Sequence, residues 1–163
     1  MICKRRIILL VSISMATMIL IVGCINPAAQ EHVDNGRKYI NSEHWDAAIT
    51  EFNEAIALAP NYSRAYNERG VAYRKKGDYE KAIADYSQAI EIDPKNAMAY
   101  NNRGYAYGDQ GDYDKAIADC SMAIEIDPKL AVAYANRAWA YIGKGEKDKA
   151  EADLKKAKEL GYK

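Results

Sequence analysis

The stretch "GDYEKAIADYSQAIEIDP" (Gly77–Pro94) decides the fold, because the chain contains it twice. Thirty-four residues later the sequence is "GDYDKAIADCSMAIEIDP" (Gly111–Pro128), identical at 15 of the 18 positions. Similarity at a fixed spacing of this length is typical of proteins built from stacked copies of one small structural unit. The sequence therefore predicts a repeat protein.

The repeat extends well beyond these two copies. Residues 29–62, 63–96, 97–130 and 131–163 align without gaps as four units, which we number one to four. Small residues recur at positions 8, 20 and 27 of the unit, and a tyrosine recurs at position 11. These residues are Gly36, Gly70, Gly104 and Ala138; Ala48, Ala82, Ala116 and Ala150; Ala55, Ala89, Ala123 and Ala157; and Tyr39, Tyr73, Tyr107 and Tyr141. Small side chains let two helices approach closely, and the aromatic rings fill the gaps between them.

Each unit is expected to form two antiparallel helices. The first helix should span 31–42, 63–76, 97–110 and 131–144, and the second 45–58, 79–92, 113–126 and 147–160. Gly77, Gly111 and Gly145 mark turns inside units, and the Asp-Pro pairs at 93–94 and 127–128 end second helices, because proline cannot continue the hydrogen-bond ladder. One helix pair is too small to bury its own apolar face, so the copies must stack.

This alignment resembles the tetratricopeptide repeat. The resemblance implies an all-α fold over residues 31–163, a right-handed α-solenoid of four helix-turn-helix units. The last unit has Glu151 and Lys158 at positions 21 and 28, where the other units have isoleucine. We therefore expect a polar outer face on unit four, as solenoids have at their ends.

A charge pattern recurs in the last three units. Position 7 is arginine and position 23 is aspartate in each of them, whereas unit one has Asn35 and Glu51. Because these positions lie on facing helices, we predict three structural ion pairs, either within a unit or between neighbours. The pairs combine Arg69, Arg103 and Arg137 with Asp85, Asp119 and Asp153.

The amino-terminal segment has the layout of a secretion signal. Three basic residues, 4–6, precede an uncharged apolar run that ends at Cys24. The residues before it, Ile21-Val22-Gly23, resemble the lipobox of bacterial lipoproteins. The resemblance implies a signal peptide of residues 1–23 that is cleaved before Cys24, and lipidation of Cys24. An uncleaved membrane anchor and ordinary secretion are the alternatives, and in each case the basic residues stay in the cytoplasm.

A lipidated Cys24 would hold the mature chain on a membrane, because acyl chains together give durable anchoring. Residues 24–30 would then be a short tether. The solenoid is expected on the extracytoplasmic, periplasmic side of the membrane, and Ile25 after the lipidated cysteine favours the outer membrane if the cell has two.

The inventory of reactive side chains argues against an enzyme. Only two histidines are present, and His32 and His44 fall at a repeat position and at a turn. Cys120 replaces an aromatic at position 24 and is expected to be a buried thiol. No pattern for a metal, cofactor or phosphate loop occurs, and 23 basic residues balance 23 acidic ones, so we expect no nucleic-acid partner.

The remaining candidate is the concave surface that solenoid curvature forms from the first helices. In the resembled family, ligands usually contact positions 2, 5, 6, 9, 12 and 13 of these helices. The groove residues expected here are Arg64, Asn67, Arg74, Asn101, Asn102, Tyr105, Asn136 and Trp139. Alternatively, Tyr105 and Trp139 pack between first helices. The family's clamp for a C-terminal carboxylate matches this sequence only at Asn102, so that specialisation is not expected.

The resemblance implies that this groove binds an extended or helical segment of a partner protein. Together with the lipid anchor, it predicts a scaffold or assembly factor of the cell envelope. One alternative is a carrier or sensor for a small ligand, such as a glycan fragment, that stacks on Trp139 and Tyr105. Another is a structural chain that associates only with itself.

Overall fold

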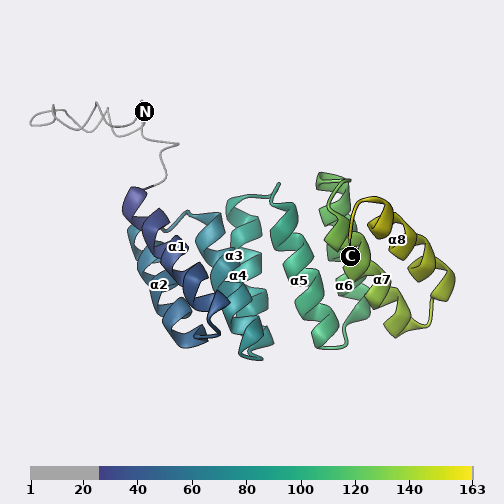
Figure 1. Ribbon diagram of the computed structural model, residues 1–163, viewed down its shortest axis with the longest axis horizontal. Coiled ribbons are helices and arrows are strands. Elements are labelled where there is room, and N and C mark those ends of the chain that lie inside the picture. Colours follow the sequence, from purple (N-terminus) through teal and green to yellow (C-terminus); the bar gives the residue numbers. More distant parts are fainter. Residues whose placement is uncertain (1–25, 163) are drawn as a thin grey trace, which may run out of the picture.

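The computed structural model describes residues 26–162, and this part of the chain contains eight α-helices and no strand (Figure 1). The predicted all-α fold is therefore confirmed. From α2 onward, every helix begins at the expected residue and ends within one residue of the expected end. The helices are α1 (Pro27–Asn41), α2 (Trp45–Leu58), α3 (Ser63–Lys75), α4 (Tyr79–Ile92), α5 (Ala97–Asp109), α6 (Tyr113–Ile126), α7 (Ala131–Lys144) and α8 (Lys147–Glu159).

Helix α1 begins four residues earlier than expected. The Asn26 side chain accepts a hydrogen bond from the Ala28 backbone N–H at 3.0 Å and donates one to the Leu58 carbonyl at 3.3 Å. Pro27 has the fixed φ that suits a first helical position, and Ala29 is fully buried. Residues 27–30 therefore belong to the solenoid, and the tether predicted over 24–30 is wrong for them. The predicted signal peptide 1–23 and Cys24 lie outside the described residues.

The turn inside each unit has one shape. The backbone is left-handed at Gly77, Gly111 and Gly145, with φ between 78° and 84°. In each turn, the residue after the glycine donates its N–H to the carbonyl of the position 11 tyrosine at 2.9 Å. Unit one forms the same turn with Glu43 at φ 61°, a conformation that side chains make costly.

Close contact within each pair depends on the small residue at position 8. A β-carbon on Gly36 would lie 2.5 Å from the Phe52 ring, and one on Gly70 would lie 2.7 Å from the Tyr86 ring. At Gly104 the nearest atom is the Cys120 sulfur, at 2.9 Å. The first helix therefore rests directly on the position 24 side chain of the second.

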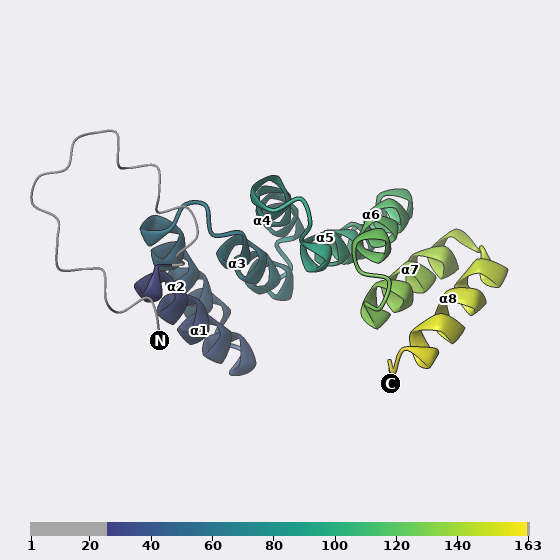
Figure 2. The same ribbon diagram turned by 90° about the horizontal axis from the view of Figure 1, so that it is seen from above.

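Neighbouring units meet through alanines on the first helices. Ala65 and Ala72 of α3 are fully buried in one cluster with Phe52 of unit one, and Ala106 of α5 is buried against Tyr86 of unit two. The first helices also contact one another in sequence, α1 with α3, α3 with α5, and α5 with α7. These contacts hold the first helices on the inner side of the arc (Figure 2), and the second helices lie outside. A concave surface results.

Candidate functional site

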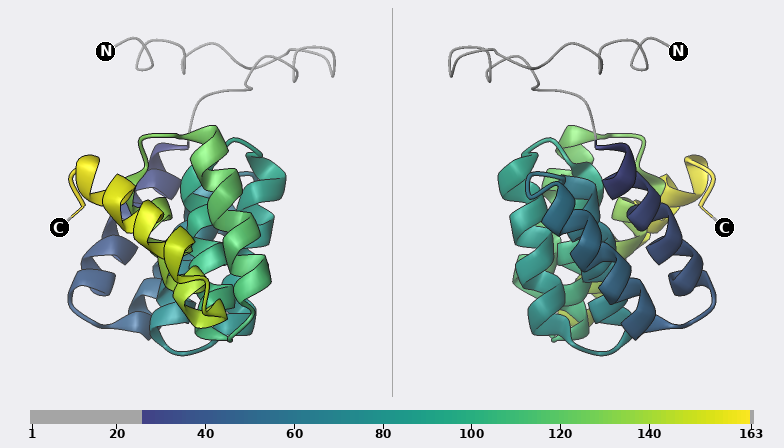
Figure 3. Two further views of the ribbon diagram at one scale, coloured as in Figure 1. Left: turned by 90° about the vertical axis from the view of Figure 1, so that its right-hand side faces the viewer. Right: turned by 90° about the vertical axis from the view of Figure 1, so that its left-hand side faces the viewer.

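The concave surface is lined by α1, α3, α5 and α7, the helices on which the groove residues were predicted. Figure 2 shows these helices on the inner side of the arc, and Figure 3 shows the array from its two ends. Position along the surface follows the chain, so units one and two form one half of it and units three and four the other. The half formed by units one and two carries most of the charged side chains, and the other half is mainly uncharged.

The four predicted asparagines form a connected chain instead of acting as free ligand contacts. Asn136 donates to Asn101 at 2.9 Å, Asn101 to Asn102 at 3.3 Å, and Asn102 to Asn67 at 3.0 Å. Asn67 is 7% exposed and Asn101 2%. The expectation that these two amides face a partner is wrong, because each lies under the next first helix and bonds to it. Asn102 and Asn136 are half-buried and border the groove.

Arg74, Tyr105 and Trp139 stack in a row across units two, three and four, which we call the aromatic row. The Tyr105 and Trp139 rings lie 5.2 Å apart at 24°, and the Arg74 guanidinium carbon lies 4.5 Å from the Tyr105 ring centre. Tyr113 meets Trp139 edge-on at 6.2 Å. The rings pack between first helices, yet Trp139 remains 37% exposed. The interpretation that these rings pack between first helices is therefore met, and the interpretation that they bind a ligand stays a prediction.

Two glycines that the sequence analysis did not single out provide the space for this row. A β-carbon on Gly108 would lie 2.2 Å from Trp139 Cζ3, and one on Gly143 would lie 2.5 Å from Tyr113 Cε1. Gly108 occupies position 12, where unit two has Arg74 and unit four Ile142. A comparison of neighbouring units could have identified Gly108, because the large Trp139 at position 9 of unit four lies against a glycine at position 12 of unit three.

The half of the groove in units one and two carries the charges. Arg37 lies 4.0 Å from Glu68, and Arg74 lies 3.4 Å from Asp109. Burial raises the pKa of Glu68, and the charges of Arg37 and Arg64 counteract this only in part. Glu68 and Asp109 offset part of the charge of the arginines here, whereas the other ligand positions of units three and four are uncharged.

A buried hydroxyl lies beside this charged half. Tyr86 of α4 is fully buried, and its hydroxyl has no hydrogen-bond partner among the described residues. Burial raises the pKa of Tyr86, and the nearby charge of Arg74 counteracts this shift. The phenol is therefore protonated at neutral pH and retains an unused donor close to Arg74.

The three predicted ion pairs are present, each within its own unit. Arg103 donates to both carboxylate oxygens of Asp119, from Nε at 2.7 Å and from Nη2 at 2.9 Å. Its Nη1 also donates to Ser87 of the preceding unit at 3.0 Å. The same arrangement recurs at the other two junctions. It joins Arg69 to Asp85 and Asn53, and Arg137 to Asp153 and Ser121.

These pairs are structural, because they are largely enclosed. The three aspartate side chains are 8–11% exposed and the three arginine side chains 19–20%. The hydrogen bonds to aspartate raise the pKa of all three arginines. Each guanidinium also lies 5.5–5.7 Å from the ring centre of the position 4 tyrosine of its unit. Unit one instead joins His32 Nδ1 to Glu51 at 2.7 Å.

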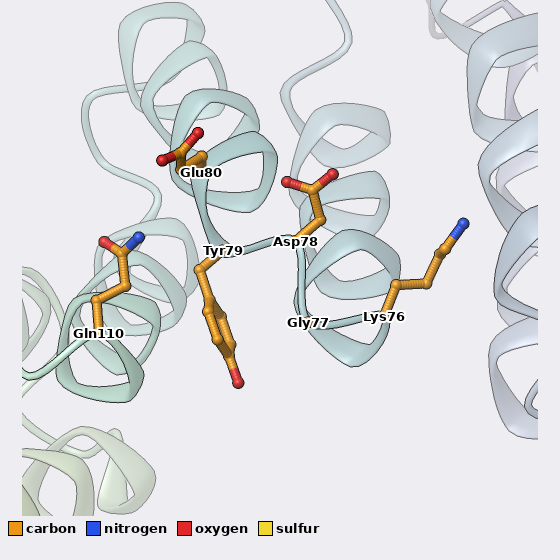
Figure 4. A pocket seen from close by; sticks show the side chains of 6 residues that line it. All are labelled: Lys76, Gly77, Asp78, Tyr79, Glu80 and Gln110. Atoms are coloured by element: carbon orange, nitrogen blue, oxygen red, sulfur yellow. The ribbon is translucent and has the colours of Figure 1, made fainter.

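Other candidate sites are weaker. Cys120 is buried, and desolvation raises its pKa to about 12, so the thiol stays protonated at neutral pH. A surface depression lies at the turn between α3 and α4, where its polar side chains do not converge on one point (Figure 4). Within residues 26–162 no group of side chains could hold a metal ion. None of the eight helices there is long and apolar enough to cross a membrane.

Comparison with known proteins identifies the repeat. A family model described as "TPR repeat" matches residues 36–77 and 70–111, and two models described as "Tetratricopeptide repeat" match 97–130 and 120–152. Tetratricopeptide repeat protein 36 of Xenopus tropicalis is 46% identical over 50 residues, which are 31% of this chain. The match spans only 25% of that relative's length.

Solved structures extend the similarity to most of the chain. A crystal structure of MamA is 29% identical, with a TM-score of 0.72, over 83% of this chain and 80% of that one. The second TPR of Spaghetti (RPAP3), bound to the HSP90 peptide SRMEEVD, is 33% identical, with a TM-score of 0.59, over 60% of this chain and 91% of that one. Four gapless helix pairs and these matches show that the chain belongs to the tetratricopeptide repeat family.

Proposed function

We propose that this chain is a lipid-anchored scaffold or assembly factor of the cell envelope, and that its groove binds a segment of a partner protein. The aromatic row is the observation that carries the proposal. Trp139 occupies a ligand position of the resembled family and is 37% exposed, while the rings of Tyr105 and Tyr113 pack against it. Rigid, partly exposed tryptophan is characteristic of the residues that dominate the binding energy of protein interfaces.

The charges on the groove suggest the chemistry of the segment. In the half formed by units one and two, Arg37 and Arg74 are paired with Glu68 and Asp109, whereas Arg64 forms no ion pair among the described residues. In the other half, Met98, Trp139 and Ile142 present exposed apolar surface. A segment with acidic side chains at one end and large apolar side chains at the other would complement both halves. A related TPR domain, that of RPAP3, is solved with the acidic peptide SRMEEVD.

Membrane attachment through Cys24 is the second part of the proposal. It rests on the lipobox-like Ile21-Val22-Gly23-Cys24 after a basic and apolar segment. Helix α1 begins at Pro27, three residues after Cys24, so the solenoid would lie close to the membrane surface. Incorporation of labelled palmitate should be lost in Cys24→Ser, and unchanged labelling would refute this attachment.

The groove is tested by cross-linking partners in intact cells. Trp139→Ala should weaken binding about 30-fold, which corresponds to roughly 2 kcal/mol for a dominant interface residue. Trp45→Ala is the matched control, because Trp45 is the other tryptophan of the chain and lies at the start of α2. Gly108→Ala displaces the Trp139 ring without removing it, so it should weaken the same cross-link.

Thermal unfolding must show that all three variants remain folded. Loss of one partner in both groove variants, but not in Trp45→Ala, would support the proposal. If the same partners persist in Trp139→Ala and Gly108→Ala, the groove does not bind them. A shift of Trp139 fluorescence by a glycan fragment alone, in a Trp45→Phe background, would indicate a small-ligand carrier instead.

A further inference from the structure

The outer face of unit four carries exposed apolar side chains. Ile142 of α7 is 55% exposed and Leu154 of α8 is 46% exposed, although both belong to the folded solenoid. The left view of Figure 3 looks onto this end, where α8 lies outermost. We call the surface formed by Ile142, Glu151, Leu154 and Lys158 the end face. It is polar at Glu151 and Lys158, as expected from the sequence, but apolar between them.

The equivalent positions of earlier units are covered by the next first helix. Phe52, Tyr86 and Cys120, which hold the position of Leu154, are all fully buried. Arg74 and Tyr86 hold the positions of Ile142 and Leu154 in unit two, and Arg74 lies close enough to influence the Tyr86 hydroxyl. Ile142 and Leu154 are therefore apolar side chains at positions that the next unit covers elsewhere in the array, and here they are exposed.

The charges on the end face are complementary to themselves. Glu151, Leu154 and Lys158 lie three and four residues apart, so they share one side of α8. Within residues 26–162, neither Glu151 nor Lys158 forms an ion pair. If a second α8 crosses antiparallel with a twofold axis beside Leu154, Glu151 of each copy faces Lys158 of the other. The two leucines then meet at the axis.

We propose that two copies of this chain associate through their end faces as a twofold dimer. An isologous interface needs a patch that is its own complement, and the order Glu151, Leu154, Lys158 provides one. The two ion pairs would fix the antiparallel register, while Leu154 and Ile142 supply the apolar contact. The proposal rests on Glu151, Leu154 and Lys158, which are not groove residues, and it does not depend on the lipid anchor.

The dimer should be weak, with a dissociation constant on the order of 10 µM, because the exposed surface of one helix pair makes a small interface. Sedimentation velocity over a wide concentration range measures it directly. Residues 26–163 suffice for the experiment, because every helix, core contact and ion pair described above lies within 26–162. The mass should rise from monomer to dimer with concentration.

Charge reversal makes the test specific. Glu151→Lys alone and Lys158→Glu alone should each weaken self-association about tenfold or more, because each places like charges across the axis. An equimolar mixture of the two single variants should associate, since every cross-axis contact then pairs opposite charges. Glu125→Lys and Lys129→Glu carry the same charge changes on the exposed surface of unit three and should dimerise like the unaltered protein.

Three results would overturn the proposal. The first is an unaltered protein that stays monomeric at all concentrations. The second is a pair of single variants that dimerise as well as the unaltered protein, which would remove Glu151 and Lys158 from any interface. The third is a mixture of the single variants that fails to associate, since the twofold pairing requires it to recover.

Discussion

Replacing Glu43 with glycine should stabilise the protein. Glu43 has a φ of 61° in the turn between α1 and α2, and the equivalent residues of the other units are Gly77, Gly111 and Gly145. All four turns donate the same hydrogen bond to the position 11 tyrosine at 2.9 Å. The geometry of the turn is thus common to the units, and only unit one forms it with a side chain present.

The size of the effect follows from two opposing terms. A left-handed conformation costs a residue with a side chain about 1.5 kcal/mol. Relief of this strain by glycine would stabilise the folded state, but glycine also loses more backbone entropy on folding, which lowers the stabilisation by about 0.7 kcal/mol. The net stabilisation by Glu43→Gly should therefore be about 0.8 kcal/mol, or about 3 °C in Tm for a domain of this size.

Urea unfolding followed by circular dichroism gives both the free energy and the slope. Gly77→Ala is the matched control, because a β-carbon there would have no atom within 4 Å and only the backbone cost remains. It should lower stability by about the same 0.8 kcal/mol. The reasoning would be refuted if Glu43→Gly lowered the free energy of unfolding and Gly77→Ala left it unchanged. Backbone conformation would then not limit stability at these turns.

Two further predictions concern charged groups. Burial raises the pKa of Glu68 above its ordinary value of 4.5, so the folded state binds a proton at this carboxyl more tightly than the unfolded state does. The resulting contribution to the free energy of unfolding is fully present below pH 4.5 and is lost as the pH rises through the pKa of the folded state. Glu68→Gln should accordingly stabilise the protein at pH 7 and give no gain at pH 4, and a gain of equal size at both pH values in thermal unfolding would contradict this. Asp119→Leu should cost about 3 kcal/mol, because it leaves Arg103 enclosed without its carboxylate. Adding Arg103→Met should recover most of that loss in a double-mutant cycle, and strictly additive losses would show that the two charges are not coupled.

The sequence was sufficient for the helices and the ion pairs because both repeat. Seven of the eight described helices begin where the alignment places them. The turn glycines, the Asp-Pro pairs and the alanines recur at the same positions in several units, so each helix boundary is marked by several copies of the same signal. Arg103 and Asp119 were predictable because arginine at position 7 and aspartate at position 23 appear together in three units and are both replaced in unit one. The start of α1 was missed because its cap, Asn26, lies outside the repeat.

The groove was harder to predict because its side chains interact across units. Asn67 and Asn102 looked like free amides when each helix was considered alone, but they bond to each other over the junction between α3 and α5. The position of Trp139 depends on Gly108, which belongs to the unit before it. A pattern along one helix does not contain these contacts, so only the packed array reveals them.

The arginine at position 7 also bears on how such an array can change in length. Each arginine bonds to a residue 16 positions ahead in its own unit and to one 16 positions behind in the preceding unit. Both connections are therefore encoded by one 34-residue period and need no residue specific to a given junction. Suppose that a copy of unit three were inserted between units two and three. The arginine of the copy would donate to Ser87 of unit two, and the serine of the copy would accept from Arg103 of the original unit three. Duplication of unit two or unit three within the gene would thus lengthen this solenoid with the new junctions already joined.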